Sequence, residues 1–365
     1  MISSRILWVL SALSVLSVVG PARADVPGAT TGQFSVENGA ASYAIPITLP
    51  PGLGEMRPEL SFNYSSSGAD GPLGAGWSVA GLSAISRCPQ TVAQDGQYVP
   101  VIFSAAISKQ RYCLDGQRLV ITSGSYSDGS MVLRPEIDNF TKVTASTWTQ
   151  YGYVYINEFE AKTKSGQTIE FGGTPDSHSS DPVYIPEMGT LSSAHTLFAN
   201  RITDAVGNYI DFQYSRPGTT ETGTVNETLI HKIHYTGNVA AGLQPNAQVE
   251  FMYETRPDTS YYYAAEIRHK REKRLKQVKI SVGGTTTRIY KLGYEQSQQG
   301  GQSQLSSVQE CGGPSGSVCL PSTNFEWQDE KTGYDYELET IGGAWGDADF
   351  RSVGTFFSEG KHDII

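Results

Sequence analysis

The sequence has little positive charge, and it has no long apolar run beyond its first residues. Its 365 residues include 27 lysines and arginines against 37 aspartates and glutamates, which gives a formal net charge of −10. This acidic balance argues against a general binder of nucleic acid or of anionic membranes. After residue 24, no segment of the sequence is apolar enough to span a membrane as a helix.

Sequence motifs for catalysis and for phosphate binding are missing as well. The chain has no H-E-x-x-H, G-x-S-x-G or P-loop pattern. Of the six histidines, only His231 and His234 lie close together in the sequence. Three residues apart on a strand, their side chains would point to opposite faces and would not share a metal. We therefore expect a protein that is not an enzyme and needs no cofactor. The two catalytic carboxylates of a glycosidase can lie far apart in a chain, and for this reason a glycosidase stays open as an alternative.

The first 24 residues have the pattern of a secretory signal peptide. Arg5 supplies the positive flank, residues 6–19 are the apolar region, and Ala22 and Ala24 are the small residues that a signal peptidase recognises. The apolar run is shorter than the ~20 residues that a membrane span needs, which disfavours an uncleaved anchor. We expect a secreted chain that begins at Asp25.

Glycine and tyrosine are abundant, with 39 and 20 residues, and they accompany a repeated strand pattern. Apolar residues alternate in segments such as SYAIPITL (42–49), where Pro46 lacks a backbone donor and so predicts a strand at a sheet edge. Other segments predict hairpins that turn at Ser165-Gly166, Gly207-Asn208 and Gly283-Gly284. No convincing amphipathic helix follows the signal peptide. The sequence predicts an all-β fold built from many hairpins.

The chain has four cysteines, which in an exported protein predict two disulfides. No two of them have the C-x₂₋₄-C spacing of a structural zinc site. They can pair in three ways. Cys311 and Cys319 flank GGPSGSV, a flexible loop that closes easily, and this favours pairing them and leaves Cys88 for Cys113.

The glycine-rich stretch GPLGAGWSVAGLSAISRCP (71–89) raises the question of a phosphate-binding loop. Gly74 and Gly76 match the start of a dinucleotide-binding G-x-G-x-x-G, but position 79 is a valine and no helix opens after it. The alternative is a turn that needs positive φ or a close backbone approach, with Trp77 packed beside it. We prefer this structural turn.

One basic cluster, RHKREKRLK (268–276), stands out in this acidic chain. It could contact a phosphate or an acidic partner surface, but the simpler interpretation is a solvated turn and edge strand. Near the end, Asp347, Asp349 and Asp363 offer hard oxygen ligands of the kind that calcium prefers, although the compact D-G centre of a calcium loop is missing. A calcium site is therefore a hypothesis for this segment.

The glycine-rich stretch, followed by YCLDGQRLV (112–120), resembles the N-terminal domain shared by SpvB-type virulence proteins and the TcaC/TcdB subunits of insecticidal toxin complexes, a domain that also heads many secreted RHS-repeat proteins. GQFSVENGAASYAIPITLPPG (32–52) and RITDAVGNYIDFQY (201–214) support the resemblance, which extends from about residue 32 to 327. The tail resembles the opening of an FG-GAP/VCBS-type β-propeller repeat, although it departs from the usual D-x-N-G-D-G loop.

The resemblance implies a layout and a function. After the signal peptide (1–24), it implies an SpvB/TcdB-like β domain (25–340) and the truncated start of an FG-GAP/VCBS-like repeat (341–365). The β domain would be a non-enzymatic part of a β-sheet shell that encloses or delivers a separate C-terminal effector. Its partners would be downstream RHS, propeller and effector domains or toxin-complex subunits, and not nucleic acid. The alternative, suggested by the tyrosines and tryptophans of a β-rich chain, is a secreted carbohydrate-binding module or glycosidase.

Overall fold

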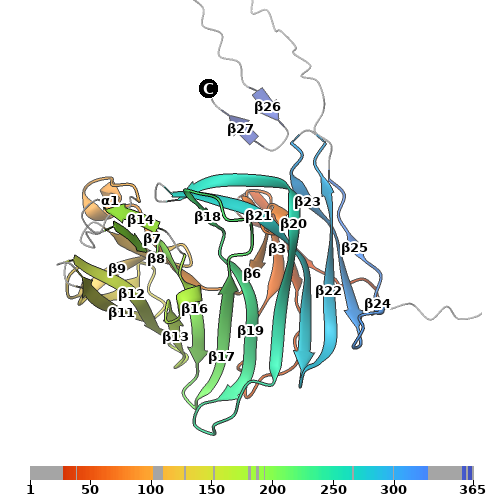
Figure 1. The fold of residues 1–365 in the computed structure, drawn as a ribbon, viewed down its shortest axis with the longest axis horizontal. Helices are drawn as coiled ribbons and strands as arrows, with labels where there is room; N and C mark the ends of the chain where they lie inside the picture. Colours follow the sequence, from red (N-terminus) through yellow and green to blue (C-terminus); the bar gives the residue numbers. More distant parts are fainter. Residues whose placement is uncertain are drawn as a thin grey trace, which may run out of the picture. The chain divides into compact units, whose positions relative to one another are not determined.

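The computed structural model divides into two compact units, Met1–Gln328 and Asp329–Ile365, which are described separately (Figure 1). The described residues are 28–37, 39–101, 110–126, 129–150, 153–179, 182–185, 189–192, 194–264, 267–298, 300–327, 356–358 and 361–363. In the second unit they form one antiparallel hairpin of β26 (Phe356–Ser358) and β27 (Lys361–Asp363). A propeller repeat in this unit therefore stays a prediction.

A ring of eight strands in the first unit closes into a barrel, because each strand pairs with the next and the last pairs with the first. A buried apolar cluster takes side chains from every strand of the ring, including Ile85, Leu119, Phe159 and Phe171, and fills its interior. In ring order the strands are β7 (Ala84–Cys88), β8 (Arg111–Leu114), β9 (Gln117–Ser123), β10 (Val132–Pro135), β11 (Lys142–Gln150), β12 (Tyr153–Lys162), β13 (Thr168–Phe171) and β16 (Thr196–Thr203).

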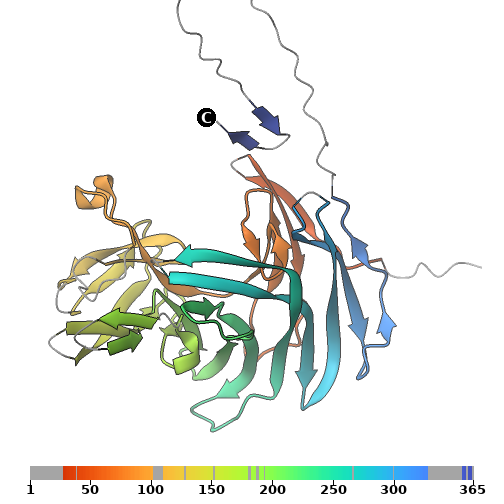
Figure 2. The ribbon, with the colours of Figure 1, turned by 45° about the horizontal axis from the view of Figure 1, so that its top comes forward.

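Strand β16 joins the barrel to a large open sheet, because its second half also pairs with β17. Figure 2 shows the β20–β21 hairpin of this sheet bending out of the sheet and reaching toward the barrel, where His269 meets the ring of His195 at 5.4 Å between centroids. From the barrel outward the strands are β17 (Asn208–Ser215), β19 (Leu229–Asn238), β20 (Ala247–Ala264), β21 (Ile267–Val282), β22 (Thr285–Gln296) and β23 (Ser303–Gly312), with β18 (Thr224–Asn226) beside β21 and with β24 (Val318–Cys319) and β25 (Thr323–Asn324) beside β23.

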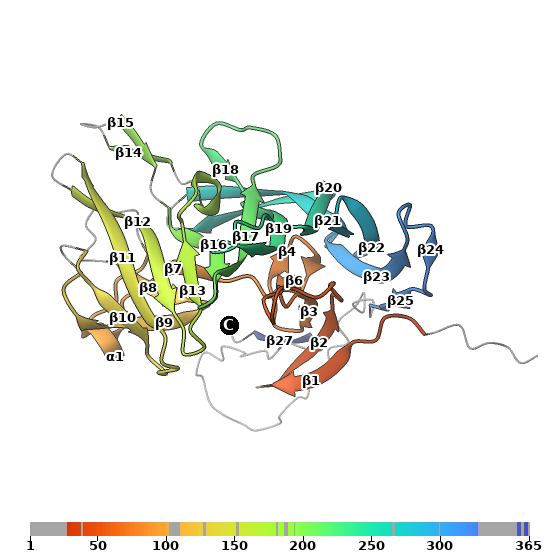
Figure 3. The same ribbon diagram turned by 90° about the horizontal axis from the view of Figure 1, so that it is seen from below.

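A smaller four-stranded sheet packs on one face of the large sheet (Figure 3). The two sheets share a core in which Ile45 and Phe62 of the small sheet meet Ile233, Phe251 and Tyr290 of the large one. The small sheet contains β1 (Gln33–Glu37), β2 (Ala40–Pro46), β3 (Ser61–Ser65) and β6 (Trp77–Ala80). The remaining short elements are the β4 (Asp70–Gly71) and β5 (Gly74–Ala75) hairpin, α1 (Val92–Asp95), the 3₁₀ turn Pro175–Ser177, and the β14 (Pro182–Ile185) and β15 (Gly189–Ser192) hairpin.

The structure confirms the all-β fold, and it corrects one strand assignment. The hairpins predicted about 165–166, 207–208 and 283–284 are present. Gly283 and Gly284 both have positive φ, as a two-residue hairpin turn requires. The prediction that Pro46 marks an edge strand is wrong, because β2 lies between β1 and β3. The β1 pairing stops at Ala44, so the proline has no partner to lose on that side.

Among the described residues, no helix has the length and apolar character to cross a membrane.

Candidate functional site

The glycine-rich stretch forms a tight hairpin, β4–β5, that leads into β6. Gly74 and Gly76 have φ of +83° and +74°. A Cβ on Gly74 would lie 2.3 Å from the carbonyl oxygen of Ser303, and one on Gly76 would lie 2.8 Å from the carbonyl oxygen of Ser65. Trp77 follows and is only 2% exposed. The hairpin therefore needs glycine both for its backbone angles and for its close approach to β23 and β3.

Trp77 packs in a group of aromatic rings between the two sheets. Its ring centroid lies 5.5 Å from that of Tyr64 and 4.8 Å from that of Phe325, and Tyr43 meets it edge-on at 6.5 Å. Such tilted and edge-on pairs add to the stabilisation that burial alone provides. The hairpin thus places Trp77 in the core, where it anchors the small sheet.

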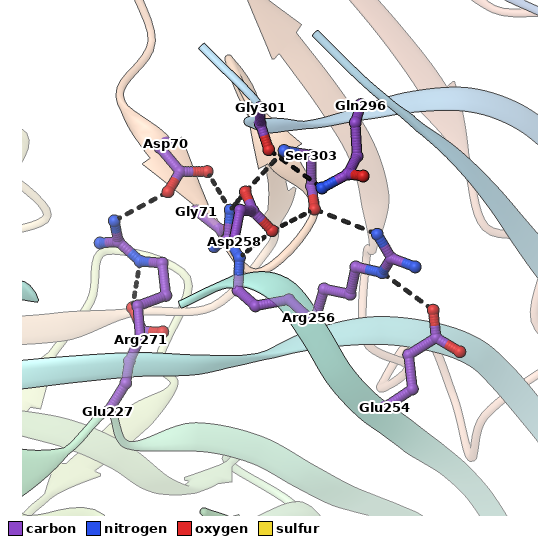
Figure 4. Close-up of polar contacts among 11 residues, drawn as sticks. Asp70, Gly71, Glu227, Glu254, Arg256, Asp258, Arg271, Gln296, Gly301 and Ser303 are labelled. Carbon is purple, nitrogen blue, oxygen red and sulfur yellow. Dashed lines mark hydrogen bonds and ion pairs between the residues drawn. The ribbon is translucent and has the colours of Figure 1, made fainter. Parts of the chain in front are cut away.

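Behind this hairpin lies a buried arginine. The side chain of Arg256 has no exposed surface. Its Nε and Nη2 donate to the two carboxylate oxygens of Asp258 at 3.0 and 2.6 Å, and Nη2 also donates to Asp70 at 2.9 Å. Nη1 donates to the carbonyl oxygen of Gly71 at 3.2 Å (Figure 4). One guanidinium therefore ties the hairpin to β20.

A bulge in β20 makes this contact possible. Pairing between β20 and β21 shifts between Thr255 and Ser260, so Arg256 and Asp258 stand in a stretch without partners on β21. Asp258 continues the network to β23, because it accepts from the backbone nitrogen of Ser303 at 2.6 Å. Burial alone would raise the pKa of Asp258, but hydrogen bonds from Arg256 and Ser303 lower it below its usual range.

The network extends to a second arginine on β21. Arg271 donates to Oδ2 of Asp70 at 3.2 Å and to Oε1 of Glu227 at 3.5 Å. Oε2 of Glu227 is buried and has no hydrogen-bond partner in the protein. Burial raises the pKa of Glu227, although the nearby Arg271 opposes the shift. Two arginines and three carboxylates thus link the four strands β4, β20, β21 and β23, and one of these carboxylates, Glu227, belongs to the residue that follows β18.

The basic cluster 268–276 is part of this arrangement and is not an open positive patch. Carboxylates form ion pairs with it along its length. Oε2 of Glu272 lies 3.1 Å from Nζ of Lys270, and Oε1 of Glu254 lies 2.8 Å from Nε of Arg274. Arg268 pairs with Glu221. The expected edge strand is present only in part: residues 268–270 pair with both β20 and β18, whereas pairing with β22 begins at Gln277, so 271–276 have β20 alone as a strand partner.

The other predicted site residues are distributed over the molecule. Disulfides join Cys88 to Cys113 and Cys311 to Cys319, which is the pairing that the sequence favoured. The first disulfide lies between the barrel strands β7 and β8, and the second joins β23 to β24. Of the calcium candidates, Asp347 and Asp349 lie outside the described residues, and Asp363 ends β27. No cluster of three or more histidine, cysteine or acidic residues suited to a metal occurs in the described part of the chain.

The histidine pair lies at an irregularity that simple strand alternation does not include. Pairing between β17 and β19 skips His231, which forms a bulge. Ile230 and Ile233 are both buried, so simple alternation fails across this segment. Strict alternation was the basis for placing His231 and His234 on opposite faces, and the bulge removes that basis.

Comparison with known proteins shows that the glycine-rich stretch lies within a segment that matches a protein-family model. Residues 35–99 match the model of the SpvB family, described as the Salmonella virulence plasmid 65kDa B protein. The N-terminal domain of the effector SpvB from Salmonella typhimurium strain LT2 matches with a TM-score of 0.54 at 18% identity, over 73% of this chain and 98% of that one. The chain has the SpvB fold. No curated protein matches it in sequence.

Toxin-complex structures share the same fold. The TcdB2-TccC3 crystal structure matches with a TM-score of 0.63 at 15% identity, over 89% of this chain and 18% of that one. The Tc holotoxin pore of Photorhabdus luminescens matches with a TM-score of 0.62 at 16% identity, over 83% and 16%. The chain therefore spans less than a fifth of the length of these toxin-complex chains. The resemblance predicted from the sequence is confirmed at the level of the fold.

The charged network is the feature that sequence reasoning missed. Its members are far apart in the chain, since Asp70 and Arg256 are 186 residues apart. A local signal exists in ETRPDTSYYY, where a proline and an Arg-x-Asp pair interrupt an otherwise regular strand pattern. A bulge with buried charges is a physical reason for such an interruption.

Proposed function

We propose that this chain is a non-enzymatic structural module of a secreted, toxin-like virulence protein, in which it forms part of a β-sheet wall. The wall would enclose or deliver a separate effector domain located downstream. The observation that supports this most is the continuous hydrogen-bonded surface that runs from the barrel through β16 to β23. A likeness that covers nearly all of the SpvB N-terminal domain structure and less than a fifth of TcdB2-TccC3 fits a module of a larger protein.

The buried network fits the same role. A wall must hold its shape while it is joined to other domains, and Arg256 fixes the β4–β5 hairpin, which connects β3 and β6 of the small sheet, to the large sheet through Asp70 and Gly71. The two disulfides brace the barrel and the far edge of the large sheet. We further propose export after cleavage at Ala24, a module boundary near residue 340, and downstream RHS, propeller or toxin-complex partners. Calcium at the aspartates of the tail belongs to the same proposal.

An experiment on the full natural protein distinguishes a structural role of this chain from a catalytic one, through the protease protection of the downstream effector domain. Substitution of Arg256 by methionine should open the wall, so that protease reaches the downstream effector domain faster while the catalytic rate of that effector in solution stays the same. Arg201→Met, which breaks an ion pair with Asp211 at the surface, is the matched control and should leave protease protection unchanged. Turnover of a glycan or a protein by residues 25–328 themselves would refute the scaffold role.

A further inference from the structure

A cleft of about 630 Å³ opens on the face of the small sheet that points away from the core. Small polar residues that share one face of the sheet line it, among them Ser42, Asn63, Ser65 and Ser78, together with the neighbouring aromatic residues Tyr43, Tyr64 and Trp77. Phe62, on the other face of the sheet, packs into the core and does not line the cleft. The volume falls within the range of about 300–1,000 Å³ that is typical of small-molecule sites.

The charged network forms one side of this cleft, through Asp70, Glu227 and Arg271. Figure 4 shows Arg271 between the two carboxylates. Oε2 of Glu227 is buried without a donor, which is unfavourable for a carboxylate unless a ligand supplies one. On the sheet, Oδ1 of Asn63 accepts from the hydroxyl of Ser61 at 2.6 Å, and this leaves the amide nitrogen as a donor.

The composition of the cleft selects a class of ligand. A cation would meet the guanidinium of Arg271, and an anion would meet the carboxylates of Asp70 and Glu227. A neutral ligand with many hydroxyls meets neither penalty, because each hydroxyl can both donate and accept a hydrogen bond. A hydroxyl that donates to a carboxylate forms one of the stronger hydrogen bonds available in proteins.

We propose that this cleft binds a short oligosaccharide. One sugar hydroxyl donates to Oε2 of Glu227, and others exchange hydrogen bonds with Asn63 and the serine hydroxyls of the sheet. The site is independent of the wall function proposed above, since it lies on the polar face of the small sheet and needs no downstream domain. Its failure would leave the wall proposal intact.

The experiment is a titration of the purified full chain, followed by ligand-observed NMR and calorimetry. The probes are mono-, di- and trisaccharides of glucose, galactose, mannose and N-acetylglucosamine, with n-butylamine and inorganic phosphate as the cationic and anionic probes. Glu227→Gln keeps the shape of the side chain and should weaken the best saccharide by about tenfold or more, as expected for the loss of a hydrogen bond to a charged group.

Two further variants make the result interpretable. Asn63→Leu changes the part of the cleft that the small sheet forms and should also weaken binding by about tenfold, which covers the case in which Glu227→Gln fails to fold. Glu160→Gln removes an exposed carboxylate outside the cleft and should leave the affinity unchanged. The proposal is overturned if no saccharide binds at about 10 mM, an affinity too weak for a built site. It is also overturned if butylamine or phosphate binds in place of sugars, or if both cleft variants bind as the wild type does.

Discussion

Replacement of Arg256 by methionine is the most direct perturbation of the network. The side chain is fully buried and makes four hydrogen bonds, to Asp258, Asp70 and Gly71. Removing one partner of a buried ion pair costs about 3–5 kcal/mol, because the remaining charge stays buried. Asp70 keeps Arg271 and Asp258 keeps Ser303, so we expect the lower end, about 3 kcal/mol in the free energy of unfolding at pH 7.

The effect should depend on pH in a defined direction. The pKa of Asp258 is lowered in the folded state, so its contribution to stability is present above its unfolded pKa of about 3.9 and is lost as the pH falls below that value. The difference between wild type and Arg256→Met should therefore shrink as the pH falls below about 4. Urea unfolding of both proteins between pH 3 and pH 7 measures this difference.

A surface pair provides the control for this prediction. Arg201 and Asp211 form a two-pronged ion pair at 2.6 and 2.9 Å, but their side chains are 36% and 28% exposed. Arg201→Met should cost less than about 1 kcal/mol, because exposed pairs contribute little. If Arg256→Met costs no more than this control, or if its cost does not change with pH, the reasoning about a buried network is wrong.

Four further predictions concern the glycine turn, Glu227, the disulfides and the signal peptide. Gly74→Ala should lower the melting temperature well beyond Gly116→Ala, because both glycines have positive φ but only Gly74 would place a Cβ against the carbonyl of Ser303; equal shifts would contradict the close approach. Burial raises the pKa of Glu227, so the folded protein favours the protonated side chain and loses stability as the pH rises and the group ionises. The melting temperature of Glu227→Gln should therefore be no lower than that of wild type at pH 7, and any excess over wild type should disappear by pH 4. A variant that melts below wild type at pH 7 would contradict this. Peptide mapping without reduction should recover both disulfides, of which the 25-residue loop stabilises by about 3–4 kcal/mol and the 8-residue loop by about 2–3 kcal/mol in the chain-entropy model; free thiols would contradict it. Intact mass of the exported protein should begin at Asp25, and a chain that retains Met1 would reject the signal peptide.

Local patterns in the sequence predicted much of the fold. Alternation of apolar residues predicted β3, where Phe62 is buried, and β17, where Ile210 and Phe212 are buried. Paired glycines at 283–284 predicted the turn between β21 and β22. These features depend on a few neighbouring residues, and the physical rules for strand faces and turns act over that same range.

Features that depend on distant residues could not be predicted. Barrel closure requires β16 to pair with β7, more than 100 residues earlier, and no local pattern encodes that partner. The bulges at His231 and after Thr255 insert residues that break the two-residue period, so faces assigned by alternation fail beyond them. The network around Arg256 depends on one of these bulges and on four separate strands, which is why its residues had no signature as a group.

The central claim is that this chain forms part of a wall around a separate effector. A cryo-electron microscopy structure of the full natural protein tests it most directly. We expect the large sheet to continue into further strands that surround an enclosed space, with downstream chain inside it and the hairpin held by Arg256 at the wall. A structure in which this module stands apart as an isolated domain, with no enclosed space beside it, would contradict the account.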